Sequence, residues 1–189
     1  MKLFLALFFS GAGIANAAVT TISGKVAPYN GNFISEVTLS ANATTYQFTG
    51  LNSVEDRGYI VDFAVKNGTT TSVSYNMLVG TFTTATDYES ERFINSGAAG
   101  AFADDSNNAF AISAGSLQPV TGRLEITHVG SEINYESFAR DGTIGARRSL
   151  RYEGNLEPPL SVAFTSFKLE SSAANGLGSG TILRLYKKR

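Results

Sequence analysis

The stretch FKLESSAANGLGSGTILRLYKKR, residues 167–189, holds two runs of alternating apolar and polar residues, separated by a turn of small residues. Alternation with a period of two is typical of β-strands, because successive side chains point to opposite faces of a sheet. In the second run Leu183 and Leu185 share one face, and Ile182 and Tyr186 share the other. The pattern predicts that the chain closes its fold on a β-strand inside a sheet. We expect only the basic residues 187–189 to be left over, free to meet an acidic neighbour.

The same period of two continues through the body of the chain. No window after residue 19 keeps the i, i+3, i+4, i+7 spacing of an amphipathic helix for three turns. The runs YIVDFAVKN (59–67) and SVSYNMLVG (72–80) flank the dipeptide Asn67–Gly68. Alternation gives each run one apolar face, which consists of Tyr59, Val61, Phe63 and Val65, expected to point inward, in the first run and of Val73, Tyr75, Met77 and Val79 in the second. Since Asn and Gly tolerate positive φ, this dipeptide predicts a tight hairpin between the two strands.

A second hairpin is predicted nearer the C-terminus. The runs INYESFARDG (133–142) and IGARRSLRYEG (144–154) flank Asp141–Gly142. Two stretches are less regular: residues 86–97 fit either a strand or a short helix, and GAAGAFADDSNN (97–108) is typical of an exposed loop.

Composition sets the fold class. The chain has 189 residues, of which 43% are hydrophobic and only 16% charged, so it can bury a core and does not have the composition of a disordered protein. About ten short strands without βαβ alternation predict an all-β fold, an antiparallel β-sandwich of jelly-roll-like type. The chain has no Cys, which excludes disulfides and thiolate metal sites.

The N-terminal residues 1–18, MKLFLALFFSGAGIANAA, form a separate segment. A lysine, a short apolar run and a closing Ala-Asn-Ala are the features of a secretory signal peptide. The apolar run is too short to span a bilayer. We therefore expect residues 1–18 to be a cleaved signal peptide or, alternatively, a retained hydrophobic peg that docks into a partner, and residues 19–189 to be a single β-sandwich domain.

Few residues suit catalysis. His128 is the only histidine, and it shares strand parity with Leu124 and Ile126, which favours a structural role over that of a catalytic base. Carboxylate pairs occur at Glu55/Asp56, Glu89/Glu91 and Asp104/Asp105, but residues so close in sequence do not provide a glycosidase pair held across a cleft. We expect no enzyme activity and no catalytic residue.

Ligand-binding motifs are also weak. The run DDSNN (104–108) supplies oxygen atoms without the spacing of a calcium-binding loop, and GLGSG (176–180) lacks the strand–loop–helix context of a phosphate cradle. In ARRSLRY (146–152) Arg147 and Arg151 share one strand face and Arg148 takes the other, which argues against a nucleic-acid groove. We therefore expect no cofactor, no metal and no nucleic acid.

Two stretches of the chain resemble a known family. The segment 34–67, with TLSANA followed by YQFTGL and a long strand, is similar to the entry of small β-sandwich structural proteins of tailed-phage virions. The end of the chain, residues 167–189, is similar to the way those proteins end, with an alternating strand, a glycine turn and then SGTILRLY (179–186). Between the two stretches, GRLEITHV (122–129) stands where those proteins have a middle strand. This resemblance to tail, fibre and capsid-decoration proteins implies a non-catalytic, oligomeric virion component with no catalytic residues to carry over.

The sequence thus predicts a virion structural protein that self-assembles and presents a β-sandwich. Its expected partners are other copies of itself and other virion proteins, with a host-surface glycan as a further ligand. The alternative is a secreted or periplasmic β-sandwich module that binds carbohydrate or a cell surface, which the signal-like N-terminus favours.

Overall fold

The computed structural model describes residues 19–21, 32–80, 88–95, 100–104, 112–114, 118–130, 132–141, 149–156 and 163–188. These residues form thirteen strands and one short helix. The elements are β1 (Val19–Thr21), β2 (Asn32–Leu39), β3 (Thr45–Thr49), α1 (Ser53–Asp56), β4 (Gly58–Lys66), β5 (Val73–Val79), β6 (Tyr88–Asn95), β7 (Gly100–Asp104), β8 (Ile112–Ala114), β9 (Pro119–Val129), β10 (Glu132–Asp141), β11 (Ser149–Leu156), β12 (Ser166–Ser171) and β13 (Ile182–Lys187).

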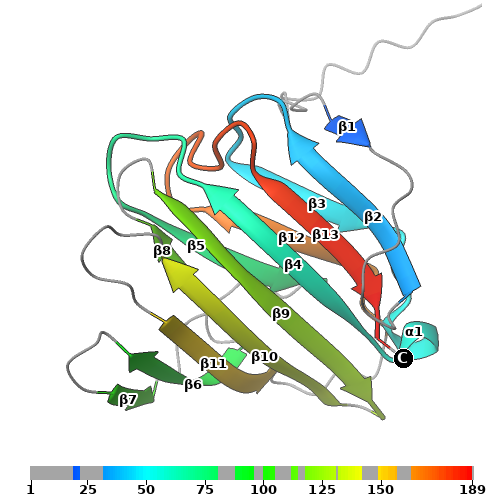
Figure 1. Ribbon diagram of the computed structural model, residues 1–189. Coiled ribbons are helices and arrows are strands. Elements are labelled where there is room, and N and C mark those ends of the chain that lie inside the picture. Colours follow the sequence, from blue (N-terminus) through cyan, green and yellow to red (C-terminus); the bar gives the residue numbers. More distant parts are fainter. Residues whose placement is uncertain are drawn as a thin grey trace, which may run out of the picture.

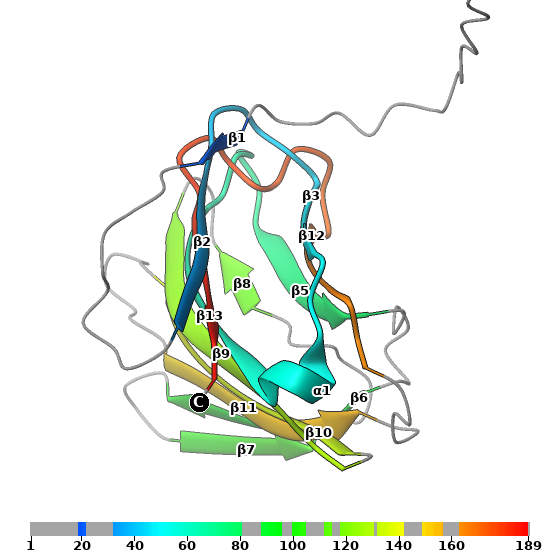
Figure 2. The ribbon, with the colours of Figure 1, turned by 90° about the vertical axis from the view of Figure 1, so that its right-hand side faces the viewer.

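The strands form two sheets that face each other. The larger sheet has nine strands in the order β1-β2-β13-β4-β9-β10-β11-β6-β7, and the smaller has four in the order β3-β12-β5-β8. Figures 1 and 2 show the small sheet lying against the β2–β9 part of the large one, while β10, β11, β6 and β7 extend the large sheet beyond it. Each neighbouring pair is antiparallel.

The strand order is that of a jelly roll. Four pairs are nested in the chain, early strands with late ones: β2 with β13, β3 with β12, β4 with β9, and β5 with β8. Successive pairs alternate between the sheets, so that β2-β13-β4-β9 faces β3-β12-β5-β8. Two nested Greek keys define the jelly roll. The predicted all-β, jelly-roll-like antiparallel sandwich is therefore confirmed.

The last strand lies inside the large sheet, as predicted. β13 pairs with β2 on one side and β4 on the other, and Leu183 and Leu185 point into the core with 1% of their surface exposed. Tyr186 lies on the opposite face against Phe33, with the ring centroids 5.7 Å apart. A β-bulge in the pairing with β2 falls between Leu185 and Tyr186.

The predicted hairpin at Asn67–Gly68 is wrong. β4 pairs with β13 and β9 in the large sheet, whereas β5 pairs with β12 and β8 in the small one, so the two strands face each other across the core. The connection is a corner held by the buried Asn67, whose side chain donates to the Thr71 carbonyl (2.7 Å) and accepts the Thr69 N–H (2.8 Å). The apolar faces of both strands are as predicted, but β4 and β5 find their hydrogen-bond partners in later strands of the chain and not in each other.

The second predicted hairpin is confirmed. β10 pairs with β11 in register from Asn134↔Asn155 to Arg140↔Ser149, although its turn lies outside the described residues. Residues 88–95, left open between strand and helix, form strand β6. The expected loop at 97–108 is partly wrong, because residues 100–104 form β7 against β6. Its sequence, rich in glycine and alanine, has no alternation of apolar and polar residues. This strand is therefore identified only by its backbone pairing with β6.

The core follows the predicted parity. In β4 the inward residues Tyr59, Val61, Phe63 and Val65 are buried, and in β5 the buried set includes Val73, Tyr75, Met77 and Val79. Gly122 of β9 is required by close packing: a Cβ there would lie 2.2 Å from the Phe138 carbonyl oxygen and 2.5 Å from the Phe63 ring. Phe63 thus covers the gap that this glycine leaves in the sheet.

Candidate functional site

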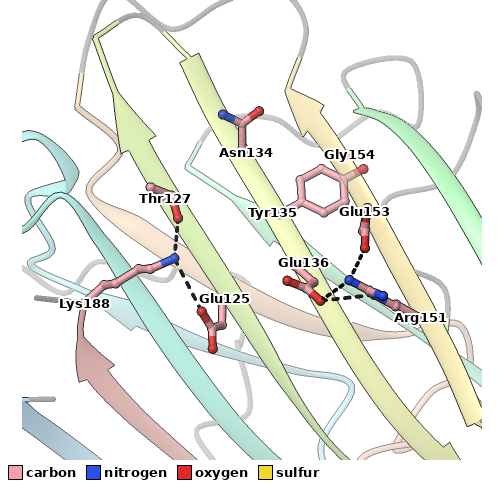
Figure 3. Close-up of a pocket in the computed structure, with 9 residues that line it drawn as sticks. All are labelled: Glu125, Thr127, Asn134, Tyr135, Glu136, Arg151, Glu153, Gly154 and Lys188. Atoms are coloured by element: carbon pink, nitrogen blue, oxygen red, sulfur yellow. Dashed lines mark hydrogen bonds and ion pairs between the residues drawn. The ribbon is translucent and has the colours of Figure 1, made fainter. Parts of the chain in front are cut away.

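A polar depression of about 400 Å³ lies on the outer face of the large sheet, over β9, β10 and β11. We call it the outer-face depression. It is shown in Figure 3 and is lined by Glu125, Thr127, Asn134, Tyr135, Glu136, Arg151, Glu153, Gly154 and Lys188. Alternation along the strands places the charged members outward, while the Tyr135 ring, 4% exposed, belongs to the inner face.

Strand register gathers the acids of this depression. Glu125 of β9 lies opposite Glu136 of β10, and Glu136 lies opposite Glu153 of β11. Directly opposed side chains have Cβ atoms about 5 Å apart, and like charges in such positions repel. The row continues by register to Glu91 of β6 and Asp104 of β7. Within the depression, the repulsion between the carboxylates of Glu125, Glu136 and Glu153 must therefore be compensated by nearby cations.

Two cations supply that compensation. Arg151 lies between Glu136 and Glu153, donates to Glu136 through Nε (3.1 Å), and also forms an ion pair with Glu153. Figure 3 shows Lys188 reaching the depression from the end of β13. Its Nζ lies 2.7 Å from Thr127 Oγ1 and 3.4 Å from Glu125. With three carboxylates and two cations, the lining keeps one net negative charge.

The terminal lysines are therefore not free, which corrects the expectation for residues 187–189. Lys187 Nζ lies 2.5 Å from Asp56 Oδ1, and the backbone N–H of Lys188 donates to the Gly58 carbonyl (3.0 Å). Burial alone would raise the pKa of Asp56, but hydrogen bonds from Lys187 and Tyr59 outweigh it and hold that pKa below its usual value. The tail is thus anchored to α1, β4 and β9. Arg189 lies outside the described residues.

The chemistry of the depression is that of a polar recognition surface. Carboxylates accept hydrogen bonds, Arg151 and Lys188 donate them, and Asn134 does both. The Tyr135 ring lies beneath the surface, so within this lining no aromatic ring is exposed for stacking against a sugar. Sequence reasoning missed Glu125, Glu136 and Glu153 as a group. The alternation along each strand places each glutamate on the outer face, but only the register between the strands makes the three glutamates neighbours.

His128 lies on the same face of its strand as Leu124 and Ile126, as its parity predicted. It lies on the inner face of β9, 6% exposed, and its Nδ1 is 2.8 Å from Oγ of Ser53 in α1. The Ser53 hydroxyl is fully buried and accepts the Phe164 N–H (2.9 Å), so its own proton can go to Nδ1. Nε2 of His128 has no partner within the described part of the chain.

The other acidic pairs named in the sequence lie on α1, β6 and β7. Glu55 and Asp56 lie on α1, where Asp56 accepts the Tyr59 hydroxyl (2.5 Å) as well as Lys187. Glu89 and Glu91 lie on β6 and Asp104 on β7, while Asp105 lies outside the described residues. Over the described ranges, no three His, Cys, Asp or Glu residues are grouped to hold a metal ion.

The basic run is only partly visible. Arg151 points outward and Tyr152 inward, whereas Arg147 and Arg148 lie outside the described residues, so their predicted faces stay a prediction. The glycine-rich residues 176–180 connect β12 to β13, and Leu177 forms bridges with Ala43 and Asn67. Within the described residues, α1 is the only helix, and no helix there is long and apolar enough to cross a membrane.

Comparison with known proteins adds no relative. No protein-family model matches the chain, and no curated protein shows significant similarity to it.

Proposed function

We propose that this chain is a non-catalytic structural protein of a virion, of the capsid-decoration, fibre or tail type, whose work is to assemble and to present a rigid β-sandwich. One observation carries the proposal. The two stretches that resemble phage virion proteins, 34–67 and the C-terminal 167–189, interleave in space as β2-β13-β4 and β3-β12. Segments from opposite ends of the chain thus form one structural unit, and the resemblance covers that whole unit.

The jelly roll itself supports an assembly role. This fold is widely used by viral capsid proteins and by lectins, so it fits both the proposal and its alternative without deciding between them. The four nested strand pairs tie the two ends of the chain together, which suits a particle component that must resist local unfolding.

The test is the composition of particles. Virions purified on a density gradient from the natural source should contain the chain at a fixed ratio to the major capsid protein, measured by quantitative mass spectrometry. The ratio should survive a high-salt wash, which removes loosely adsorbed protein. A chain found only in the particle-free medium would overturn the proposal. Its intact mass would then show whether residues 1–17 or 1–18 had been removed by export.

A second candidate is a secreted or periplasmic module that binds carbohydrate. The outer-face depression favours it, because its carboxylates, Asn134 and Arg151 offer both acceptors and donors to vicinal hydroxyl groups. A glycan array would test it with the variant Arg151→Met. The matched control is Arg184→Met, which removes an arginine from an ion pair with Glu36 on the same face, outside the depression. Binding lost only in Arg151→Met would support this candidate, and an array without binding would contradict it.

A further inference from the structure

The strand β3 lies at an edge of the small sheet. Among the described residues it pairs with β12 on one side, and no strand pairs with its other side. Figure 2 shows β3 at the open edge of the small sheet, across from β2. Proteins usually block such edges with charged residues, Pro or a bulge. The sequence of β3, Thr-Tyr-Gln-Phe-Thr, contains no charge and no Pro.

The hydrogen-bond pattern shows which backbone groups are directed to this edge. The Ser171 N–H donates to the Thr44 carbonyl (2.9 Å), one residue beyond the paired Thr45↔Glu170. Because an antiparallel ladder alternates, Tyr46 and Phe48 direct their backbone groups to β12 as Thr44 does. The residues between them, Thr45, Gln47 and Thr49, direct their N–H and C=O groups to the free edge. Their side chains are exposed.

The strand is also self-complementary. Its residue types are symmetric about Gln47: Thr45 matches Thr49, and the aromatic Tyr46 matches the aromatic Phe48. A twofold interface must bring the same surface of two copies together, so a strand that pairs with itself needs this symmetry. Thr, Tyr and Phe also have high strand propensity.

We propose that β3 pairs antiparallel with β3 of a second copy. The twofold axis of this dimer passes midway between the two Gln47 residues. Thr45 then lies opposite Thr49 of the other chain and Gln47 opposite Gln47, so the outward backbone groups form about six hydrogen bonds. On the inner face Tyr46 lies opposite Phe48 of the other chain in a non-hydrogen-bonded pair, where side chains are closest. The two four-stranded sheets become one continuous sheet of eight strands.

Partly exposed apolar side chains beside β3 also favour pairing with a second copy of the chain. A cavity of about 360 Å³ opens between the two layers there, with Ile34, Tyr46 and Phe48 in its lining. Ile34 is 38% exposed, and Tyr46 is only partly buried although its ring packs against Phe48 with the centroids 5.1 Å apart. The second copy brings the equivalent aromatic pair to this edge and covers part of the Tyr46 ring.

A pair of double variants tests the register directly. Thr45→Lys with Thr49→Lys places lysine opposite lysine at both outer positions, whereas Thr45→Lys with Thr49→Glu places lysine opposite glutamate. Both are made in the full-length chain, and both place the same new lysine opposite Glu170 of β12, so they differ only at position 49. Sedimentation velocity over a concentration series measures the mass of each, against 20.0 kDa for one chain. Thermal unfolding checks that both are folded.

We expect the wild type and the lysine–glutamate variant to dimerise, and the lysine–lysine variant to dimerise at least about tenfold more weakly. Hydrogen exchange of the Thr45, Gln47 and Thr49 amides should slow as wild-type concentration rises. A monomeric wild type, or a lysine–lysine variant that dimerises as well as wild type, overturns the proposal. Protection of these amides that does not depend on concentration also overturns it, since the chain's own N-terminal segment would then cover the edge.

Discussion

At the residue scale, Ser53 joins three parts of the molecule. Its hydroxyl lies in α1, 2.8 Å from His128 Nδ1 of β9, and it accepts the Phe164 N–H from the segment that leads into β12. All three residues are buried. A buried polar group without a partner costs about 1–3 kcal/mol, so the value of Ser53 lies mainly in the two groups that it satisfies.

Replacing Ser53 by Ala should therefore destabilise the fold by about 2–4 kcal/mol, since the Phe164 N–H and the His128 imidazole both lose their partner. Urea unfolding of the variant and the wild type measures the difference. The exposed Thr70 offers a matched control: Thr70→Ala also removes one hydroxyl group and should change stability by less than about 0.5 kcal/mol. Equal effects from the two variants would contradict this account of the serine.

At the element scale, two rows of side chains cross the outer face of the large sheet and behave differently. In one row Glu36, Arg184, Asp62 and Arg123 lie on neighbouring strands with alternating sign, and Arg123 holds Asp62 through two hydrogen bonds of 2.6 and 3.1 Å. The next row opposes Glu125, Glu136 and Glu153 directly. In the first row neighbouring charges attract one another, whereas the second row depends on Arg151 and Lys188 to compensate its three carboxylates.

The short helix α1 is likewise held by a charged contact, in this case with the last strand, β13. Asp56 accepts hydrogen bonds from Tyr59 and Lys187, and its pKa is held below the usual value. The ionised carboxylate therefore stabilises the fold above the unfolded-state pKa of about 4, and this contribution is lost as the pH falls through the lower, folded-state pKa.

Lys187→Met should consequently lower the free energy of unfolding at pH 7 by up to about 1 kcal/mol, because the lysine is partly exposed. The gap between this variant and the wild type should shrink as the pH falls below about 4. Denaturant unfolding at several pH values measures it. In a double-mutant cycle, Asp56→Asn should remove most of the effect of Lys187→Met at pH 7. A gap that stays constant with pH would show that the ion pair is not its source.

At the scale of the whole molecule, the jelly roll makes the fold depend on its ends. β2 and β3 pair with β13 and β12, so strands far apart in the chain must meet before either sheet is complete. Such non-local pairing slows folding, because loop closure precedes the contacts that compensate for it. β13 also places Leu183 and Leu185 in the core between β2 and β4.

A chain that stops at residue 179 should therefore show no cooperative unfolding transition, since it lacks β13 altogether. A chain that stops at Tyr186 should fold with a stability lower by about 1–2 kcal/mol, because it loses the contacts of Lys187 and Lys188 with Asp56, Thr127 and Gly58. Thermal unfolding followed by circular dichroism distinguishes the two. A cooperative melt near wild type for the shorter chain would contradict the central role of β13.

The sequence by itself determined the strands and their faces, because a period of two is a local property that each segment carries alone. It predicted the inward residues of β4, β5 and β13, the sandwich class and the strand face of His128. Pairing is not local, and only the tertiary structure decided it. Asn67–Gly68 turns a corner between sheets because β4 and β5 find partners elsewhere in the chain. The acidic row follows from the register of the consecutive strands β9, β10 and β11, and the fixed terminal lysines follow from the pairing of β13 with the distant β4. Alternation within one strand specifies neither.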